Sequence, residues 1–490
     1  MAKLQSGVSG GASNGAFGAA LSGGMAGLAS VTLVGSLGVS LANVALPDLA
    51  GRFGAPLGTV KWVVVAYLLA STMTVLGAGR LGDRLGHGRV LRAGLWLFAL
   101  ASLLSALAPS LWLLALARAV QGVAAAAMLA QSLVLAQALS AGGGSGRAMG
   151  LMGSMSAIGT ALGPSLGGLV LEFAGWRAMF LLPLPLAILG WWLCRGVADG
   201  TRRMVRERFD RTGFALIGVA IAFYALALDP GGAALRPWRA ALAGGAVVAG
   251  LGFLVWQRRA AAPLLNLGLL ASPGRAAGLV TNGLVAAIMM ATLVVGPFYL
   301  SGVHGLSVAE VGLVLAAGPA LSMASGVPAG HLADRLGTGG TLAAGLATMC
   351  AGTLALALLP GWLGLPGYFV GIALLTPGYQ AFQAANNAGL MAGAPAEARG
   401  AVAGLVTLSR NLGLITGASA MSGLFARGAG TSDLLHAGPD ALVQGFQLTF
   451  LVAGGLVALS LLAAAGARAS EGTERQPPVS QPPVRPGRGP

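Results

Sequence analysis

Long apolar runs, separated by short polar stretches, recur along the whole chain. Each run holds about 18 to 25 residues, the length with which an α-helix crosses a hydrocarbon core of about 30 Å. The pattern predicts fourteen spans, near residues 27–47, 60–79, 90–108, 111–138, 148–171, 178–194, 212–228, 240–257, 276–300, 309–330, 340–359, 367–391, 400–425 and 443–466. The expected fold class is therefore an all-α integral membrane protein, whose even number of spans puts both termini on one side.

Composition agrees with a membrane protein and excludes a soluble one. Of 490 residues, 56% are hydrophobic and 9% are charged, whereas about 25% of the residues of a soluble protein are charged. The net charge of +15 would suit a nucleic-acid partner, but its distribution does not. Of the 29 lysines and arginines, 21 fall on the side of the predicted termini, six on the other side, and Arg118 and Arg410 inside spans. The positive-inside rule then predicts cytoplasmic termini and a multi-pass protein of the inner membrane.

Two halves with a shared motif organise the spans. "GRLGDRLG" (79–86) follows the second span and "GHLADRLG" (330–337) follows the tenth. Setting aside spans seven and eight leaves two six-span halves with this motif at the same place, as expected for a transporter with parallel repeats. The predicted organisation is a flexible tail (1–25), a first bundle (26–195), a basic cytoplasmic loop (196–211), two linker helices (212–257), a second cytoplasmic loop (258–274), a second bundle (275–467) and a disordered tail (468–490).

Four motifs together resemble the major facilitator superfamily, and within it the branch of fourteen-span drug–proton antiporters. "GRLGDRLGHGR" (79–89) is similar to the family's loop motif, "RAVQGVAAA" (118–126) to its fourth-span motif and "WRAMFLLPLP" (176–185) to its sixth-span entry. The fifth span matches the antiporter motif at Gly150, Gly159, Gly163, Pro164, Gly167 and Gly168. The resemblance implies two six-helix bundles with two helices between them, export driven by protons, and no cofactor or metal.

The loop and antiporter motifs have expected physical roles. The residues assigned to the gating loop are Gly79, Asp83, Arg84, Gly86 and Arg89, with Gly330, Asp334, Arg335 and Gly337 in the second half. Their charges are expected to latch one conformation and release it on rocking, or else only to orient a turn. Glycines four apart form a stripe on which another helix can approach closely, and Pro164 predicts a bend. Ordinary helix packing is the alternative for the stripe.

Polar residues inside spans are the candidates for the substrate and proton pathway. They are Asn43, Arg118, Gln121, Tyr379, Gln380, Gln383, Asn386, Asn387 and Arg410. A guanidinium deep in a span normally faces the protein interior, where it holds an anion, tunes a neighbouring proton site or makes a structural hydrogen bond. Arg410 could instead snorkel to the inner surface. The amides near residue 380 suit a substrate wall or hydrogen bonds between helices.

The first span departs from the branch's pattern. In "LGVSLANVALP" (37–47), Asn43 and Pro47 match, but Gly38 stands where an Asp is usual, and no carboxylate falls near the centre of any predicted span. Because a cation needs a counter-charge in a low-dielectric cavity, we expect neutral, zwitterionic or anionic substrates.

Other classes of protein fit less well. A P-loop is absent because neither Lys3 nor Lys61 lies in one, no catalytic or metal-binding constellation such as HExxH occurs, and Cys194 and Cys350 are isolated. The expectation is a monomeric exporter of small organic molecules in the lipid bilayer, not an enzyme, with protons and periplasmic adaptor proteins as further partners. A proton-coupled importer and a transporter-like sensor are the alternatives.

Overall fold

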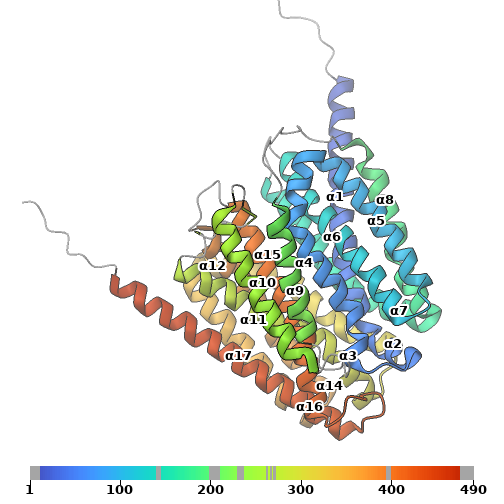
Figure 1. Ribbon diagram of the computed structural model, residues 1–490, viewed down its shortest axis with the longest axis vertical. Coiled ribbons are helices and arrows are strands. Elements are labelled where there is room, and N and C mark those ends of the chain that lie inside the picture. Colours follow the sequence, from blue (N-terminus) through green and yellow to red (C-terminus); the bar gives the residue numbers. More distant parts are fainter. Residues whose placement is uncertain are drawn as a thin grey trace, which may run out of the picture.

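The computed structural model describes residues 11–139, 145–197, 210–228, 237–260, 263–264, 268, 272–392 and 399–474, and these contain helices and no strand (Figure 1). The first half comprises α1 (Gly11–Val44), α2 (Leu46–Phe53), α3 (Leu57–Val60), α4 (Trp62–Leu85), α5 (His87–Leu107), α6 (Leu111–Leu139), α7 (Ser145–Leu181), α8 (Pro183–Leu193) and the short 3₁₀ helix η1 (Cys194–Gly196). Helix α1 begins at Gly11, earlier than the predicted first span.

Two further helices follow, and then the second half. The linker helices are α9 (Arg211–Ala227) and α10 (Arg239–Arg259). The second half comprises α11 (Pro273–His304), α12 (Val308–Leu358), α13 (Pro360–Leu363), α14 (Leu365–Ala392), α15 (Arg399–Thr416), the π-helix η5 (Gly417–Met421), α16 (Ser422–Gly428) and α17 (Pro439–Glu474).

Ten stretches of the described residues are long and apolar enough to cross a membrane. One of them, Ile158–Gly196, holds 39 residues and changes direction at Gly175, whose φ is 78°. Helix α9 is apolar but shorter than the others. The all-helical membrane architecture is therefore confirmed, while the count of fourteen spans stays a prediction.

The repeated motif ends at the same backbone device in both halves. Gly86, between α4 and α5, has a φ of 97°, and Gly337, inside α12, has a φ of 70°. Side chains rarely adopt this left-handed region, which glycine enters freely. Each motif thus closes a turn between two antiparallel helices, which explains why its last residue is glycine in both copies.

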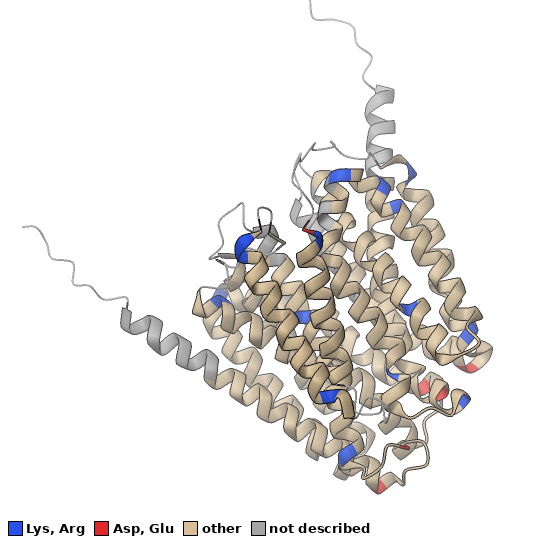
Figure 2. Ribbon diagram, in the orientation of Figure 1, with Lys and Arg blue, Asp and Glu red and all other residues tan. Residues whose placement is uncertain are grey.

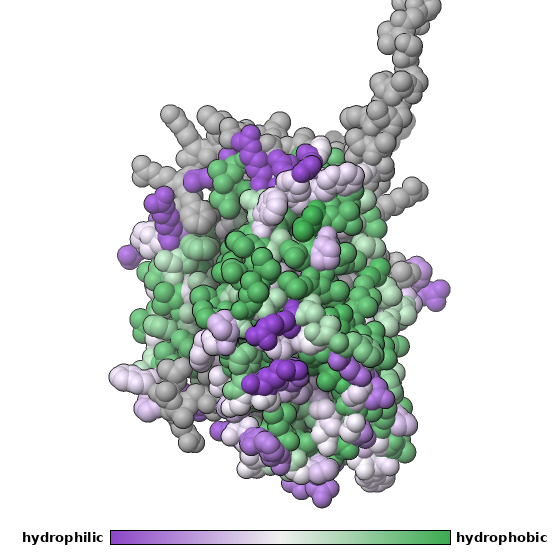
Figure 3. Space-filling model, turned by 90° about the vertical axis from the view of Figure 1, so that its right-hand side faces the viewer, coloured by the Kyte–Doolittle hydropathy of each residue, from purple (hydrophilic) through white to green (hydrophobic). Residues whose placement is uncertain are grey.

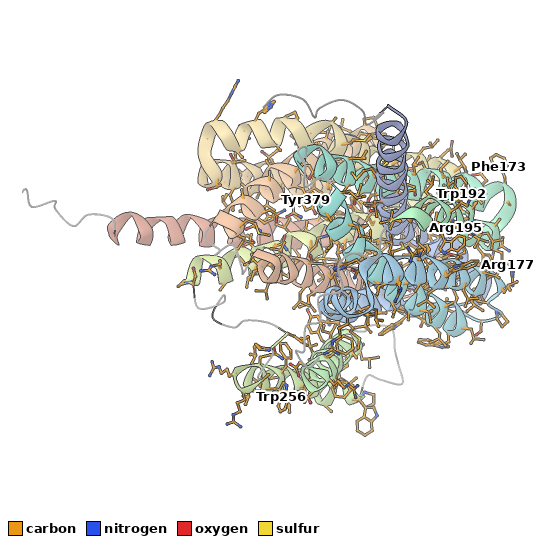
Figure 4. The ribbon with its side chains drawn as sticks, turned by 90° about the horizontal axis from the view of Figure 1, so that it is seen from above. Phe173, Arg177, Trp192, Arg195, Trp256 and Tyr379 are labelled. Carbon is orange, nitrogen blue, oxygen red and sulfur yellow. The ribbon has the colours of Figure 1, made fainter. Side chains whose placement is uncertain are left out.

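The linker helices lie outside the two bundles. Viewed from above, α9 and α10 stand apart from the other helices (Figure 4). Helix α9 packs on α10, on α4 and, over a smaller contact, on α15. Buried Asp210 joins the pair, because its carboxylate accepts from the Gly213 N–H at 2.8 Å, from Trp256 Nε1 at 2.7 Å and from Gln257 Nε2 at 2.7 Å.

Basic residues occur at both ends of the molecule, whereas most of the described carboxylates lie at one end (Figure 2). We call one end arginine-rich, because the described arginines there are Arg84, Arg89, Arg92, Arg195, Arg211, Arg258, Arg259, Arg275 and Arg335. We call the other end acidic because most of the described carboxylates gather there, beside basic residues such as Arg52 and Arg177; these carboxylates are Asp48, Glu172, Glu310, Asp433 and Asp440. Between them the surface is largely apolar (Figure 3).

Candidate functional site: the contacts between the halves and the buried polar groups

The antiporter motif presents glycines to two different helices. On one face, a Cβ built on Gly163 would overlap Ser40 Oγ of α1, and one on Gly167 would lie 2.8 Å from Leu41 Cδ1. Gly159 likewise leaves no room, because its Cβ would overlap the Leu33 carbonyl. Real Cβ atoms essentially never come this close. The stripe predicted from the spacing of four is therefore confirmed as a close α1–α7 contact inside the first half.

The other face of the motif meets the second half. A Cβ on Gly168 would lie 2.7 Å from the Val308 carbonyl oxygen and 3.1 Å from Gly312 Cα, both on α12. From the opposite side, a Cβ on Gly312 would overlap the Pro164 carbonyl. Pro164 stays inside α7, where the recorded backbone break lies at Gly175. The predicted motif thus also lies on the seam between the two halves.

A carboxylate crosses this seam at the acidic end. Glu172, one turn beyond Gly168 on α7, accepts a hydrogen bond of 2.7 Å from the backbone N–H of Ala309. Ala309 lies in the first turn of α12, where free N–H groups and the helix dipole favour an anion. The same helix is capped by its own Ser307 and Glu310. Glu172 is therefore an additional ligand of the α12 N-terminus, supplied by the other half.

The second seam between the halves lies at α4 and α15, and helix α9 contacts both. A Cβ on Gly218 of α9 would lie 2.5 Å from Met73 Cε of α4. One and a half turns further, Tyr224 Oη lies 2.6 Å from Thr416 Oγ1 of α15. Thr416 directly precedes the π-helix η5, a feature frequent at functional sites. Sequence analysis did not identify this contact.

Arg118 is sealed within the first half, where it is fully buried. Its Nε donates to the Val63 carbonyl at 3.1 Å, its Nη2 donates to the Gly38 carbonyl at 2.8 Å, and its Nη1 donates to Gln121 Oε1. The guanidinium also lies 4.4 Å from the centre of the Tyr67 ring. Arg118 therefore ties α6 to α1 and α4, and backbone carbonyls replace a carboxylate as its partners.

Position 38 lies directly beside this guanidinium. A Cβ built on Gly38 would lie 2.9 Å from Phe98 Cζ and 3.5 Å from Tyr67 Oη. No described residue offers Arg118 a carboxylate. Gln121 extends the hydrogen-bond network to α5, because its Nε2 donates to Ser102 Oγ at 2.7 Å. Asn43 lies apart from this network and is fully buried, and its Oδ1 has no hydrogen-bond partner.

The amides predicted on the twelfth span divide into different environments. Gln380 donates to the Ser322 carbonyl of α12 at 2.9 Å, and Gln383 donates to Tyr379 Oη at 2.8 Å. Asn386 is buried, with its Nδ2 unpartnered, whereas Asn387 is exposed. The substrate wall assigned to them stays a prediction.

A residue that sequence analysis overlooked contributes to the same polar region. Asn282 of α11 is 1% exposed, and its Nδ2 donates to the Val406 carbonyl of α15 at 3.0 Å, while its Oδ1 has no partner. A Cβ on Gly278, one turn before Asn282, would lie 3.0 Å from Asn386 Oδ1. An asparagine within an apolar span was a signal that could have found it.

Arg410 differs from Arg118 in its exposure and in its contacts. It lies in the second turn from the end of α15 and is exposed. Neither a hydrogen bond, an ion pair nor a ring contact joins it to another residue of the described part of the chain. Of the two arginines predicted inside spans, only Arg410 has its guanidinium available to a ligand.

The charges of the gating loop are only partly described. Arg84, Arg89 and Arg335 are exposed at the arginine-rich end. The side chains of Asp83 and Asp334 lie outside the described part of the structure, as do the surroundings of Gly79 and Gly150. A Cβ on Gly330 would meet nothing within 4 Å. The latch assigned to these residues stays a prediction.

Comparison with known proteins identifies the family. The sequence model of the Major Facilitator Superfamily matches residues 28–418. The chain belongs to this superfamily. It is 32% identical over 383 residues to the uncharacterized transporter YebQ of Escherichia coli (strain K12), a match that covers 78% of this chain and 84% of YebQ.

Two further similarities support this assignment. The chain is 31% identical to the multidrug resistance protein Stp of Mycobacterium tuberculosis (strain CDC 1551 / Oshkosh), over 79% of this chain and 72% of Stp. The fold is also similar to the crystal structure of a bacterial homolog of the human lysosomal transporter Spinster in an inward-facing, unoccupied conformation. That similarity has a TM-score of 0.66 at 14% identity and covers 94% of this chain and 99% of the other. The chain is thus a multi-pass membrane transporter.

Proposed function

We propose that this transporter exports small organic molecules by alternating access and is driven by the proton gradient. The observation that carries the proposal is the glycine-lined antiporter motif, which packs both on α1 and, through Gly168, on α12 of the other half. A motif in this place can seal one seam while the opposite end opens. The similarity to a multidrug resistance protein supports export.

The arginine-rich end is proposed to face the cytoplasm, together with both termini, following the positive-inside rule. Under this orientation the Gly168–Gly312 contact and the Glu172–Ala309 hydrogen bond close the outer side. Nearer the arginine-rich end, a Cβ built on Gly326 or Gly330 of α12 would meet nothing within 4 Å. The described arrangement is then closed to the outside, which is the state that receives cytoplasmic substrate.

Arg410 is proposed to set the charge of the substrate. A guanidinium without a partner attracts carboxylates and phosphates and repels cations. Because Arg118 is fully buried and bonded to two backbone carbonyls and Gln121, it contributes little to this selection. Neutral, zwitterionic or anionic compounds are the expected substrates.

Two measurements test the proposal. Export predicts that inside-out vesicles accumulate substrate when their lumen is acidified, whereas accumulation only by right-side-out vesicles would indicate an importer. For the substrate's charge, Arg410→Gln removes the exposed guanidinium, and we expect it to lower efflux of an anionic antibiotic relative to that of a permanently cationic dye. Strong efflux of the dye by the wild type, with the ratio of the two compounds unchanged in Arg410→Gln, would contradict the expected substrate class but not transport itself.

A further inference from the structure

The outer face of the first half gathers tryptophans and arginines at the arginine-rich end. Helices α5 and α8 pack together there. Trp96 of α5 and Trp191 of α8 make an edge-to-face pair, with ring centres 5.3 Å apart and planes at 65°. Arg195 lies over Trp191, its Cζ 3.9 Å from the ring centre, and Trp192 is exposed beside it (Figure 4). We call Trp96, Trp191, Trp192 and Arg195 the α5–α8 cluster.

Arg195 is held in place but keeps its hydrogen-bond donors. The stack on Trp191 is its one interaction with the described residues, and no carboxylate among them pairs with it. A guanidinium carries five N–H donors in one plane. Stacking fixes that plane while leaving its edge free, which suits the bidentate binding of a phosphate. Within the described part of the chain, this exposed guanidinium has no anionic partner.

A second guanidinium is anchored at the same edge. Arg92 lies one turn before Trp96 on α5, and its Nη1 donates to the Val197 carbonyl at 3.2 Å. Val197 follows Arg195 by two residues, so this bond brings the two arginines to the same edge. Positive charge is therefore concentrated beside the tryptophans.

Below the α5–α8 cluster, toward the middle of the molecule, the same two helices are apolar and exposed. Trp96 and Trp192 are 56% and 60% exposed. The aliphatic residues that continue this face are Leu100, Leu103, Leu104 and Leu107 of α5 and Ile188 and Leu189 of α8. Figure 3 shows the side of the molecule on which α5 and α8 lie. The order arginine, indole, aliphatic side chain matches the order phosphate, glycerol region, acyl chain of a membrane leaflet.

We propose that the α5–α8 cluster, with Arg92, binds an anionic phospholipid from the leaflet at the arginine-rich end. The phosphate lies on the edge of the Arg195 guanidinium, Arg92 adds positive charge beside it, and the acyl chains lie on the leucine face. Charge complementarity selects an anionic lipid, and the exposed aliphatic column favours a lipid over free phosphate. This site is separate from the seams α7–α12 and α4–α15, at which the halves meet.

Arg177 provides a matched comparison at the acidic end. It also stacks on a tryptophan, with its Cζ 4.4 Å from the centre of the Trp176 ring. Trp176, however, is buried and packs on Phe53 and Phe180. Arg177 therefore stacks on an indole as Arg195 does, but this indole is buried and not exposed above an aliphatic face.

Native mass spectrometry of the full-length protein tests the site with phosphatidylglycerol and phosphatidylcholine of identical acyl chains. We expect the wild type to retain phosphatidylglycerol preferentially. Arg195→Gln should weaken that retention about fivefold, since one basic residue near an anionic surface contributes about 1 kcal/mol. Arg177→Gln should retain the lipid as the wild type does, and millimolar inorganic phosphate should not displace it.

Equal retention of phosphatidylglycerol by Arg195→Gln and the wild type, or an equal loss in Arg177→Gln, would overturn the proposal. Retention that appears only in a dimeric species would assign this face to a second copy and would overturn it as well. A second measurement uses the wild type alone, so that its result does not depend on whether a variant folds. Phosphatidylglycerol brominated in its acyl chains should quench tryptophan fluorescence more strongly than brominated phosphatidylcholine, and equal quenching counts against the site.

Discussion

The two faces of the antiporter motif predict two different phenotypes for the same substitution. Gly163→Ala places a methyl group against α1, within the first half, whereas Gly168→Ala places one against α12, across the seam. At Gly163 the new Cβ would lie 2.8 Å from Ser40 Cβ, and ordinary contacts begin at 3.4 Å. The α1 and α7 helices must therefore separate by roughly 0.6 Å, and the Ser40 hydroxyl, which the new Cβ would overlap, must turn away.

The magnitudes follow from overpacking and from helix propensity. Overpacking a close contact costs about 1–3 kcal/mol, and the gain from replacing a helical glycine by alanine is about 1 kcal/mol. Gly163→Ala should thus lower the thermal stability of the detergent-solubilised protein. Gly326→Ala is the matched control on α12, because its Cβ would meet nothing within 4 Å, and it should leave stability equal or slightly higher.

Gly168→Ala should act on the conformational equilibrium instead. Its Cβ would lie 2.7 Å from the Val308 carbonyl, a contact that, under the proposed orientation, breaks when the outer side opens. A penalty of about 1–3 kcal/mol on one state shifts the equilibrium about 5- to 150-fold. The reporter is Ala309→Cys, at a position 8% exposed, with Cys194 and Cys350 replaced by serine and a membrane-impermeant maleimide added outside. Labelling no faster in Gly168→Ala than in the parent, or a loss of thermal stability as large as that in Gly163→Ala, would refute this reasoning.

Three further predictions concern the polar contacts. Glu172→Gln should accelerate the same labelling about two- to fivefold, because an anion at a helix N-terminus contributes about 0.3–1 kcal/mol. Glu310→Gln, which changes the cap that α12 forms with its own residues, should leave the labelling rate unchanged. Equal acceleration by both variants would exclude a clamp across the seam. Tyr224→Phe and Thr416→Val should each remove the hydrogen bond between these two side chains, about 0.5–1.5 kcal/mol. Because both variants lose the same bond, the double variant should label no faster than either single variant. Additive effects would show that the two hydroxyls act independently. Asp83→Asn should insert into the membrane normally and transport slowly, and normal transport at matched expression would remove the gating role from that loop.

Sequence periodicity was enough for the features that repeat. Glycines spaced by four predicted a helix contact, because their spacing is a regularity within one segment of chain. The duplicated loop motif predicted two halves, and that division stays a prediction. The structure adds that the motif's last glycines, Gly86 and Gly337, both have a positive φ, so part of the repeat serves the turn itself.

The contacts between distant segments gave no such signal. Glu172 and Ala309 lie 137 residues apart, and Tyr224 and Thr416 lie 192 residues apart. In the first pair the partner is a backbone N–H, which every residue other than proline offers. The carbonyl partners of Arg118 are hidden for the same reason, since no side-chain pattern marks the positions that supply them. Asn282 was visible as a polar residue in an apolar span, but only the fold places it beside Asn386.

The surroundings of Arg118 also bear on how this chain departs from its family pattern at position 38. A fully buried guanidinium requires compensation, and here Gly38 supplies a carbonyl oxygen at 2.8 Å where a carboxylate is usual in the resembling branch. The Gly38 carbonyl accepts one hydrogen bond from Arg118, but it neither cancels the charge of the guanidinium nor takes up a proton. Position 38, where the resembling branch usually has an Asp, therefore supports the Arg118 side chain in this chain. If protons drive this transporter, the group that binds them therefore lies elsewhere than at position 38.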